Sequence, residues 1–185
     1  MLTELIFSLR SVSPLERSHA EMARLLEQAV DRYRPGAPAL VARPGGYTRT
    51  CAHFDERFEV LLLNWAPGSR SCLHDHGGQH CWLAVLDGAV RLENYDRLDG
   101  GENPGRAIVA ARDSGTLERG QLDLRSAAVD LHRVSAAADG GAVTLHVYAL
   151  PLREFNAYDE LAHRCRPCRP RYDAVLPFAV EAPVA

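Results

Sequence analysis

The chain has 185 residues, a formal net charge of −3 and hydrophobic side chains at 46% of its positions. This length suffices for one domain with a hydrophobic core and is short for two, so we expect residues 1–185 to form a single domain. The small net charge argues against a dedicated nucleic-acid or membrane surface, and the absence of lysine excludes Schiff-base chemistry.

The sequence also predicts where the protein is found. No apolar run approaches the roughly 18 residues of a membrane span, and the segment from Met1 to Phe7 carries Glu4 with no preceding basic region, unlike a secretory signal. Five cysteines, an odd number, fit a reducing compartment better than a disulfide framework. We therefore expect a cytoplasmic monomer with no nucleic-acid or membrane partner.

The first predicted element is an amphipathic helix over residues 13–34. Ser13-Pro14-Leu15-Glu16 is typical of a helix start, with a hydroxyl cap, proline in the first turn and glutamate three residues after the cap. Apolar residues then recur at helical spacing until Pro35, namely Leu15, Met22, Leu25, Leu26, Ala29, Val30 and Tyr33. We expect this helix to pack outside a β domain.

From about residue 46 the sequence changes to short apolar stretches separated by Gly, Asp, Asn and Pro, which is typical of antiparallel strands. The stretches are 57–65, 80–86, 89–95, 107–111, 130–135 and 142–150. Asp87-Gly88, between two of them, predicts a hairpin turn. We therefore predict a mainly β fold, a jelly roll or small barrel over about residues 45–150, followed by an irregular tail over about 164–185.

A candidate metal site begins at His74-Asp75-His76. Residues two apart on a strand face the same side, so both imidazoles can point into a barrel and bind one metal ion. Neutral imidazole suits Fe, Zn, Cu or Ni, so the pair does not choose the metal. On its own, such a pair is weak evidence for a site.

The spacing around this pair is that of the first cupin motif, and the matching positions are Gly68, His74, His76 and Gly88. Cys81 stands where that motif usually has a metal-binding Glu. A third ligand is available from Leu131-His132-Arg133-Val134, late in the β region, where the second cupin motif has its histidine. Thr144, His146 and Tyr148 then share one face of a late strand, a pattern that on its own is more typical of a buried core strand.

Four motifs in this order resemble those of the cysteine dioxygenase family. They are Tyr47-Thr48-Arg49, His74-Asp75-His76 with His80-Cys81-Trp82, Leu131-His132-Arg133-Val134, and Thr144-Leu145-His146-Val147-Tyr148. The resemblance covers about residues 45–150. It implies a cupin fold and a non-haem iron thiol dioxygenase that converts L-cysteine and O2 into cysteine sulfinate.

The resemblance implies that His74, His76 and His132 bind Fe(II), and that Arg49, helped by Tyr47, binds the substrate carboxylate. Three neutral imidazoles leave the charge of Fe(II) uncompensated, which favours binding of an anionic thiolate. A planar guanidinium can bind a carboxylate through two hydrogen bonds. These roles are consistent with a substrate held by its carboxylate while its thiol reaches the metal.

The resemblance further implies that Tyr148 points its phenol at the open side of the metal, with His146 and Thr144 behind it in a relay. Cys81 is expected beside Tyr148, with which it can form the thioether cross-link known in part of the family. His80, next in sequence, should face away from the metal, because strand alternation turns it to the other side.

Two positions depart from the family pattern. Thr144 replaces Ser, which keeps the hydroxyl but adds a methyl group that restricts the rotamer. Ala149-Leu150-Pro151 stands where the mammalian-type pattern of the family has Ser-Pro-Pro, so a cis bond there would involve Leu150, and cis bonds without proline are rare.

Two alternatives stay open at this point. The enzyme could act on another small thiol acid such as 3-mercaptopropionate, although relatives with that preference tend to carry Gln at the position of Arg49. The chain could instead be a metal-binding cupin without oxygenase activity. A cupin isomerase would prefer Glu at position 81, and a pure binding protein would not need His146 and Tyr148 at the metal.

Overall fold

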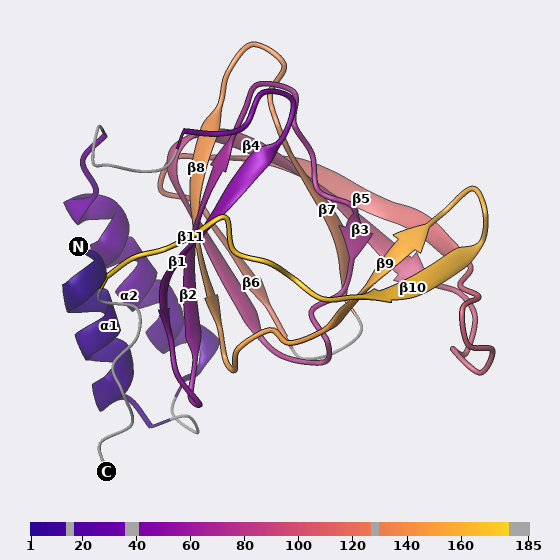
Figure 1. The fold of residues 1–185 in the computed structure, drawn as a ribbon, viewed down its shortest axis with the longest axis horizontal. Helices are drawn as coiled ribbons and strands as arrows, with labels where there is room; N and C mark the ends of the chain where they lie inside the picture. The colour runs from indigo at the N-terminus through magenta and orange to yellow at the C-terminus, as the bar shows by residue number, and fades with distance from the viewer. Residues whose placement is uncertain (14–16, 36–40, 127–129, 178–185) are drawn as a thin grey trace.

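The computed structural model describes residues 1–13, 17–35, 41–126 and 130–177 (Figure 1). Two helices come first, α1 (Leu2–Ser11) and α2 (His19–Arg32). The strands follow in the order β1 (Tyr47–Phe54), β2 (Glu59–Trp65), β3 (Leu73–His74), β4 (Cys81–Arg97), β5 (Val109–Glu118), β6 (Leu122–Arg125), β7 (Leu131–Ala136), β8 (Ala142–Tyr148), β9 (Phe155–Asp159), β10 (Arg164–Cys168) and β11 (Ala174–Val175).

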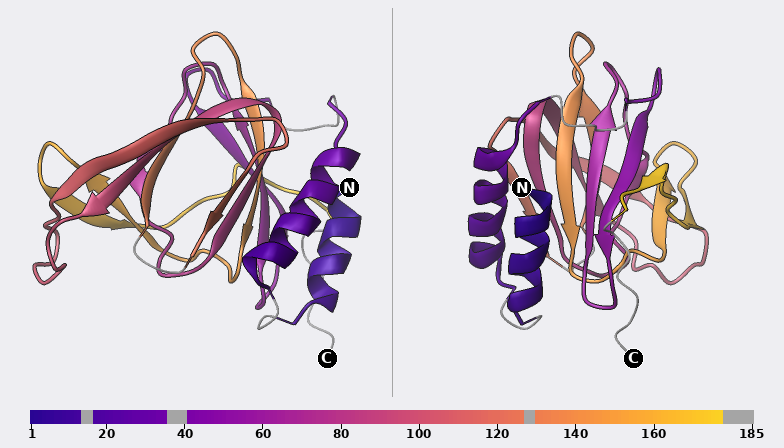
Figure 2. Two further views of the ribbon diagram at one scale, coloured as in Figure 1. Left: turned by 180° about the vertical axis from the view of Figure 1, so that it is seen from behind. Right: turned by 60° about the vertical axis from the view of Figure 1, so that its left-hand side comes forward.

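These strands form one bent sheet, in the order β10-β9-β3-β7-β4-β8-β2-β1-β11, with β5 and β6 paired to β4 beside this path. Both helices cover one outer face of the sheet, and the β9–β10 hairpin lies at the opposite end of the molecule (Figures 1 and 2). The predicted mainly β fold with a helix outside is confirmed. Among the described strands no pairing joins β10 to β11, so the sheet stays open instead of closing into a barrel.

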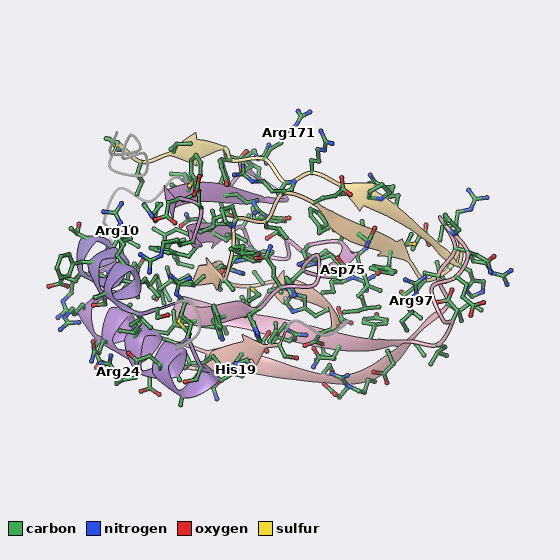
Figure 3. The ribbon with its side chains drawn as sticks, turned by 90° about the horizontal axis from the view of Figure 1, so that it is seen from below. Arg10, His19, Arg24, Asp75, Arg97 and Arg171 are labelled. Carbon is green, nitrogen blue, oxygen red and sulfur yellow. The ribbon has the colours of Figure 1, made fainter. Side chains whose placement is uncertain are left out.

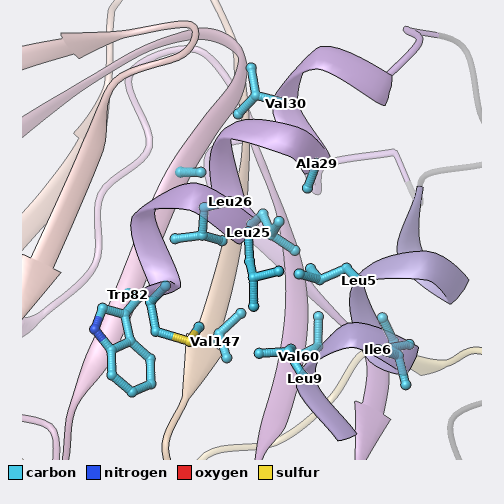
Figure 4. Packing of buried hydrophobic residues seen from close by; sticks show 14 of the residues in the cluster. Leu5, Ile6, Leu9, Leu25, Leu26, Ala29, Val30, Val60, Trp82 and Val147 are labelled. Carbon is cyan, nitrogen blue, oxygen red and sulfur yellow. The ribbon is translucent and has the colours of Figure 1, made fainter. Parts of the chain in front are cut away.

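The helices bury their apolar faces on the sheet (Figure 4). Met22, Leu25 and Leu26 of α2 are almost fully buried and belong to one cluster with Val60 and Val147 of the sheet. Leu5, Ile6 and Leu9 of α1 join the same cluster. Burial of one such side chain contributes about 1.5–3 kcal/mol, so this contact fixes the helices to the sheet. Within the described ranges, neither helix is long and apolar enough to cross a membrane.

The predicted helix start at Ser13 is wrong. Helix α2 begins at His19, where the side chain of Ser18 accepts a hydrogen bond from the backbone N–H of Glu21 at 3.2 Å. The sequence contains a second Ser-x-x-Glu pattern at Ser18, and this one is the cap that the chain uses. Residues 14–16, on which the predicted start depended, lie outside the described residues. Helix α1 was not predicted.

Strand β4 runs without interruption through Asp87-Gly88, so the predicted hairpin there is wrong. Gly88 has a φ of 68°, and the pairing with β8 shifts in register between Val85 and Asp87. The glycine therefore bends one strand instead of reversing the chain. Before the bend β4 pairs with β6 and β8, and after it with β5 and β7.

Alternation along β4 separates two hydrophobic clusters. Trp82, Ala84 and Leu86 pack with the helices, whereas Cys81, Leu83 and Val85 face the interior of the bent sheet. Interior positions of β1, β2 and β8 follow the same period of two. The predicted site residues on these strands consequently face one interior.

The segment after residue 150 is more regular than predicted. Strands β9 and β10 form an antiparallel pair, and β11 lies parallel to β1, with Thr50 opposite Ala174. Asp173 holds this return, because its backbone N–H donates to the Arg49 carbonyl and its Oδ2 accepts from the Arg49 N–H, both at 2.8 Å. The expectation of an irregular tail is wrong for β10 and β11, which form strands, and residues 178–185 of the predicted tail lie outside the described residues.

Gly88→Ala should lower the free energy of unfolding by about 1–3 kcal/mol, because the positive φ disfavours any side chain and an added Cβ would overlap the Gly141 carbonyl oxygen. Gly115→Ala is the matched control, since nothing lies within 4 Å of an added Cβ there. Urea unfolding of both variants measures the difference. Equal stability of the two would show that the bend at Gly88 does not depend on glycine.

Candidate active site

Three histidines meet in the interior of the bent sheet. His74 on β3 is the register partner of His132 on β7, and His76 follows β3. One ring nitrogen from each histidine lies within 4.8 Å of the others. The ring centroids are 4.7 Å apart for His74 and His132, 4.8 Å for His76 and His132, and 5.3 Å for His74 and His76. The structure thus brings the three predicted ligands together.

These imidazoles are neutral at physiological pH. Burial is the main cause that lowers the pKa of His74 to about 4 and the pKa values of His76 and His132 well below 6.5. Nδ1 of His74 donates to the carbonyl of Cys72 at 2.9 Å, which leaves Nε2 as the free lone pair of that ring. A cluster of neutral imidazoles with free lone pairs is the donor set that a transition metal needs.

Asp75, between the first two histidines, shapes the loop that carries them. Its Oδ1 accepts from the backbone N–H groups of Gly77 and Asn156 at 3.1 and 2.9 Å. Its Oδ2 accepts from the Asn156 side chain at 2.9 Å and the Tyr158 hydroxyl at 2.8 Å. Figure 3 shows Asp75 among the strands, well away from the helices. Sequence analysis gave this residue no role, although its position within the motif was the signal.

Cys81 and Tyr148 are directly opposite each other on β4 and β8. Burial is the main cause that raises the pKa of the Cys81 thiol to about 12, and a hydrogen bond with the Tyr148 phenol opposes this rise. Burial and the nearby Cys81 hold the pKa of Tyr148 well above 10. Both groups are therefore protonated, and the His76 ring lies 6.0 Å from the Tyr148 ring.

Thr144 and His146 are hydrogen-bonded to each other, between Thr144 Oγ1 and His146 Nε2 at 2.8 Å. Thr144 Oγ1 also accepts from the Trp65 indole N–H at 2.9 Å, and Trp65 stacks on Tyr47 with ring centroids 4.4 Å apart. Burial lowers the pKa of His146 to about 3, so its ring is neutral. Trp65 was missed by sequence analysis, although its spacing from Leu61 and Leu63 places it on the interior face.

Arg49 supplies positive charge to this interior. Its Nε and one terminal nitrogen, Nη2, are buried and have no hydrogen-bond partner in the protein. Its charge contributes to lowering the pKa values of His74 and His146 and opposes the rise in the pKa of Tyr148. A buried guanidinium with free N–H groups costs free energy unless an acceptor is supplied, so Arg49 is suited to bind an anionic ligand.

Glu59 is a second ionisable group that sequence analysis missed. It is fully buried on β2, opposite Tyr148. Burial raises its pKa, while the Leu152 N–H, which donates to Oε2 at 2.8 Å, and the charge of Arg49 oppose this rise. From the sequence alone, a glutamate beside an apolar strand is expected to be exposed to solvent, because carboxylates are mostly exposed. Only the fold shows that Glu59 lies in the interior.

His80 lies outside the histidine cluster. Its ring stacks on Trp82 at 5.5 Å and contacts His19 edge to face at 5.6 Å, and His19 marks the junction of α2 and the sheet in Figure 3. A separate surface cavity of about 630 Å³ is lined by residues of β7, β9 and β10, none of them a predicted site residue.

The family model for cysteine dioxygenase type I matches residues 39–161, more than half of the chain. The chain belongs to this family. The expected family is thereby confirmed, and the expected mainly β fold is confirmed by the eleven described strands.

Curated relatives agree with the assignment to the cysteine dioxygenase type I family. Cysteine dioxygenase type 1 of Rattus norvegicus is 27% identical over 163 residues, which cover 86% of this chain and 79% of the rat protein. The Danio rerio protein of the same name is 28% identical over 109 residues, covering 56% of this chain and 51% of that protein.

Solved structures give a more distant likeness. An uncharacterized protein with a double-stranded β-helix domain from Klebsiella pneumoniae has a TM-score of 0.45 and 17% identity, covering 70% of this chain and 94% of that one.

The two departures from the family pattern have different local consequences. Thr144 keeps its hydroxyl in a hydrogen bond with His146, so the replacement of Ser leaves that contact in place. The described backbone has no cis peptide bond, and the Leu150 N–H donates to the Gln79 side chain at 2.8 Å. The chain after Tyr148 is thus held to the histidine loop without a cis bond.

Thr144→Val should destabilise the protein by about 1–3 kcal/mol, because it leaves the Trp65 indole N–H and His146 Nε2 buried without a partner. Thr144→Ser, which keeps the hydroxyl, should recover most of this loss. Thermal or urea unfolding compares the two. If Val and Ser variants were equally stable, the hydroxyl would not hold the indole and the imidazole in place.

Proposed function

We propose that this protein is a non-haem Fe(II) thiol dioxygenase that converts L-cysteine and O2 into cysteine sulfinate. The reaction adds both oxygen atoms of O2 to the substrate sulfur, so that R–SH and O2 give R–SO2H with no further reactant. The observation that carries the proposal is the cluster of His74, His76 and His132, together with Arg49, whose charge acts on His74 and whose Nε and Nη2 have no partner, in a chain of the cysteine dioxygenase type I family.

The donor set fits iron. Three neutral imidazoles form a face with no carboxylate among the ligands, and small movements bring nitrogens within 4.8 Å to the separation that one ion requires. Fe(II) bound there would hold the substrate thiolate and O2 next to each other and carry the electron transfer between them. The three histidines themselves add no negative charge, so the site favours an anionic sulfur ligand.

Arg49 and Tyr47 bind the substrate carboxylate in this proposal. The free Nε and Nη2 groups of Arg49 present two parallel N–H donors, which match a carboxylate. Tyr47, held by stacking on Trp65, keeps its phenol protonated because burial raises its pKa. An aminothiol without a carboxylate would leave these buried donors unpaired, which disfavours it as a substrate.

Tyr148 acts as the hydrogen-bond donor at the reacting atoms. Its raised pKa keeps the phenol protonated, so it can donate towards an oxygen atom that gains negative charge. The Thr144 hydroxyl oxygen accepts a hydrogen bond from the Trp65 indole N–H. Its own O–H group can therefore donate to His146 Nε2. The neutral His146 then carries its proton on Nδ1, and the relay fixes this tautomer.

Loading the protein with Fe(II) should give oxygen consumption with L-cysteine, with lower kcat/KM for 3-mercaptopropionate and cysteamine. Arg49→Gln should raise the KM for L-cysteine about 10- to 100-fold, because a charge-assisted contact with the carboxylate is lost. Arg91→Gln, which removes a guanidinium bonded to Ser114 on the exposed β4–β5 surface, is the matched control and should leave KM unchanged.

The outcomes separate the alternatives. A preference for 3-mercaptopropionate would change the substrate but keep the reaction, and an unchanged KM in Arg49→Gln would remove Arg49 from substrate binding. No oxygen uptake with any thiol would leave a metal-binding cupin without oxygenase activity. The monomeric state, the cytoplasmic location and the absence of a nucleic-acid partner stay predictions from the sequence.

We also propose that aerobic turnover joins Cys81 to Tyr148 by a thioether bond, with O2 accepting the two electrons and two protons removed. Support comes from their opposed positions on β4 and β8 and from the effect of each group on the pKa of the other. Intact mass after turnover should show a fraction of the protein lighter by two hydrogens, and Cys81→Ala should show none. A wild-type mass that never changes during turnover of cysteine would exclude the cross-link and leave the dioxygenase assignment intact.

A further inference from the structure

We infer that Asp123 is a positioning residue of the metal site, which accepts a hydrogen bond from Nδ1–H of His132 and so directs Nε2 of that ring at the metal. The inference rests on the proposed function to the extent that His132 must bind a metal ion. Neither the sequence motifs nor the family resemblance gave Asp123 a role.

His74 and His132, the two histidines of the cluster that lie on strands, differ in the contacts that hold their rings. Nδ1 of His74 donates to the Cys72 carbonyl at 2.9 Å. Nδ1 of His132 is buried without a hydrogen-bond partner, and Asp123 Oδ2 lies 3.7 Å away. A shift of less than about 1 Å would make this contact a hydrogen bond. Metal-binding histidines almost always donate their second ring N–H to a carboxylate, a carbonyl or water, which fixes the tautomer and the ring orientation.

Strand pairing places Asp123 on the interior side. Asp123 on β6 is opposite Leu83 on β4, and Leu83 is opposite His146 on β8. The carboxylate also affects other groups of the site, since it opposes the fall in the pKa of His76 and adds to the rise in the pKa of Cys81. Its side chain is 16% exposed, so it is largely removed from solvent.

Arg125 fixes the position of this carboxylate. Its Nε donates to Asp123 Oδ2 at 2.5 Å, Nη1 donates to Asp130 at 2.8 Å and Nη2 donates to the Asn94 side-chain oxygen at 2.6 Å. Asn94 on β4 is in turn the register partner of His132 on β7. A buried guanidinium thus connects the strand that carries Asp123 with the strand beside His132.

Arg125 differs from Arg49 in that its hydrogen-bond donors have partners within the protein. Each of the three nitrogens of Arg125 has a partner in the protein, and the residue is 4% exposed. Arg49 has buried N–H groups without partners. Arg49 is therefore available to a ligand, whereas Arg125 serves to orient Asp123 and, through it, His132.

The competing explanation is that Asp123 only compensates the charge of Arg125. Asp130 provides the matched control, because it binds the same guanidinium, whereas the carboxylate that lies beside His132 Nδ1 is that of Asp123. Asp123→Ala should weaken Co(II) binding about 10- to 100-fold, whereas Asp130→Ala should change it less than about threefold. Asp123→Asn, which keeps a neutral acceptor and a similar shape, should give an intermediate loss and covers the case in which the alanine variant does not fold.

The experiment measures the Co(II) dissociation constant of the full chain by competition with a chelator, beside the stability of each variant without metal. A second measurement follows the exchangeable imidazole N–H signals of the Co(II) protein by NMR, where the His132 signal should exchange faster with solvent in the Asp123 variants and not in Asp130→Ala. Equal Co(II) affinity in the Asp123 and Asp130 variants would overturn the inference. A wild-type protein that binds no Co(II) or Fe(II) would overturn the proposed function as well, and this result is distinct from the first.

Discussion

The bend of β4 at Gly88 is the constraint on which the site depends. The first half of β4 pairs with β8, which carries Thr144, His146 and Tyr148, and the second half pairs with β7, which carries His132. One continuous strand, which itself carries Cys81, therefore connects the strand of His132 with the strand of Tyr148. Gly88 lies so close to the Gly141 carbonyl that a side chain would not fit there. The bend therefore requires glycine at this position.

The interior on this frame is unusual for a protein core because it combines apolar residues with many polar groups. Most of these groups have partners within the protein: Thr144 binds Trp65 and His146, and Arg125 binds Asp123, Asp130 and Asn94. Nε and Nη2 of Arg49 are among the buried polar atoms that have no partner within the protein. Since an unpaired buried polar group costs free energy, an anionic ligand bound at Arg49 would stabilise this part of the interior.

Electrostatics in this interior favour the protonation states that the proposed reaction needs. Burial keeps the imidazoles neutral, and it keeps the phenol of Tyr148 and the thiol of Cys81 protonated. The charge of Arg49 acts in the same direction on the histidines and in the opposite direction on the phenol. Neutral imidazoles and a protonated phenol therefore share the interior with the positive charge of Arg49, an arrangement that supports the proposed anionic thiol acid substrate.

The sequence by itself determined the family, the mainly β class and the residues that meet at the site, because motif spacing and the period of two along strands are local properties of the chain. It did not determine the path of β4, since Asp-Gly has the same local preferences in a turn and in a bend, and only the pairing with β7 and β8 decides between them. The sequence also did not predict that Asp123 and Glu59 lie in the interior, because charged residues are expected to be exposed to solvent. Their roles depend on strands far apart in sequence that enclose them, and this enclosure exists only in the tertiary structure.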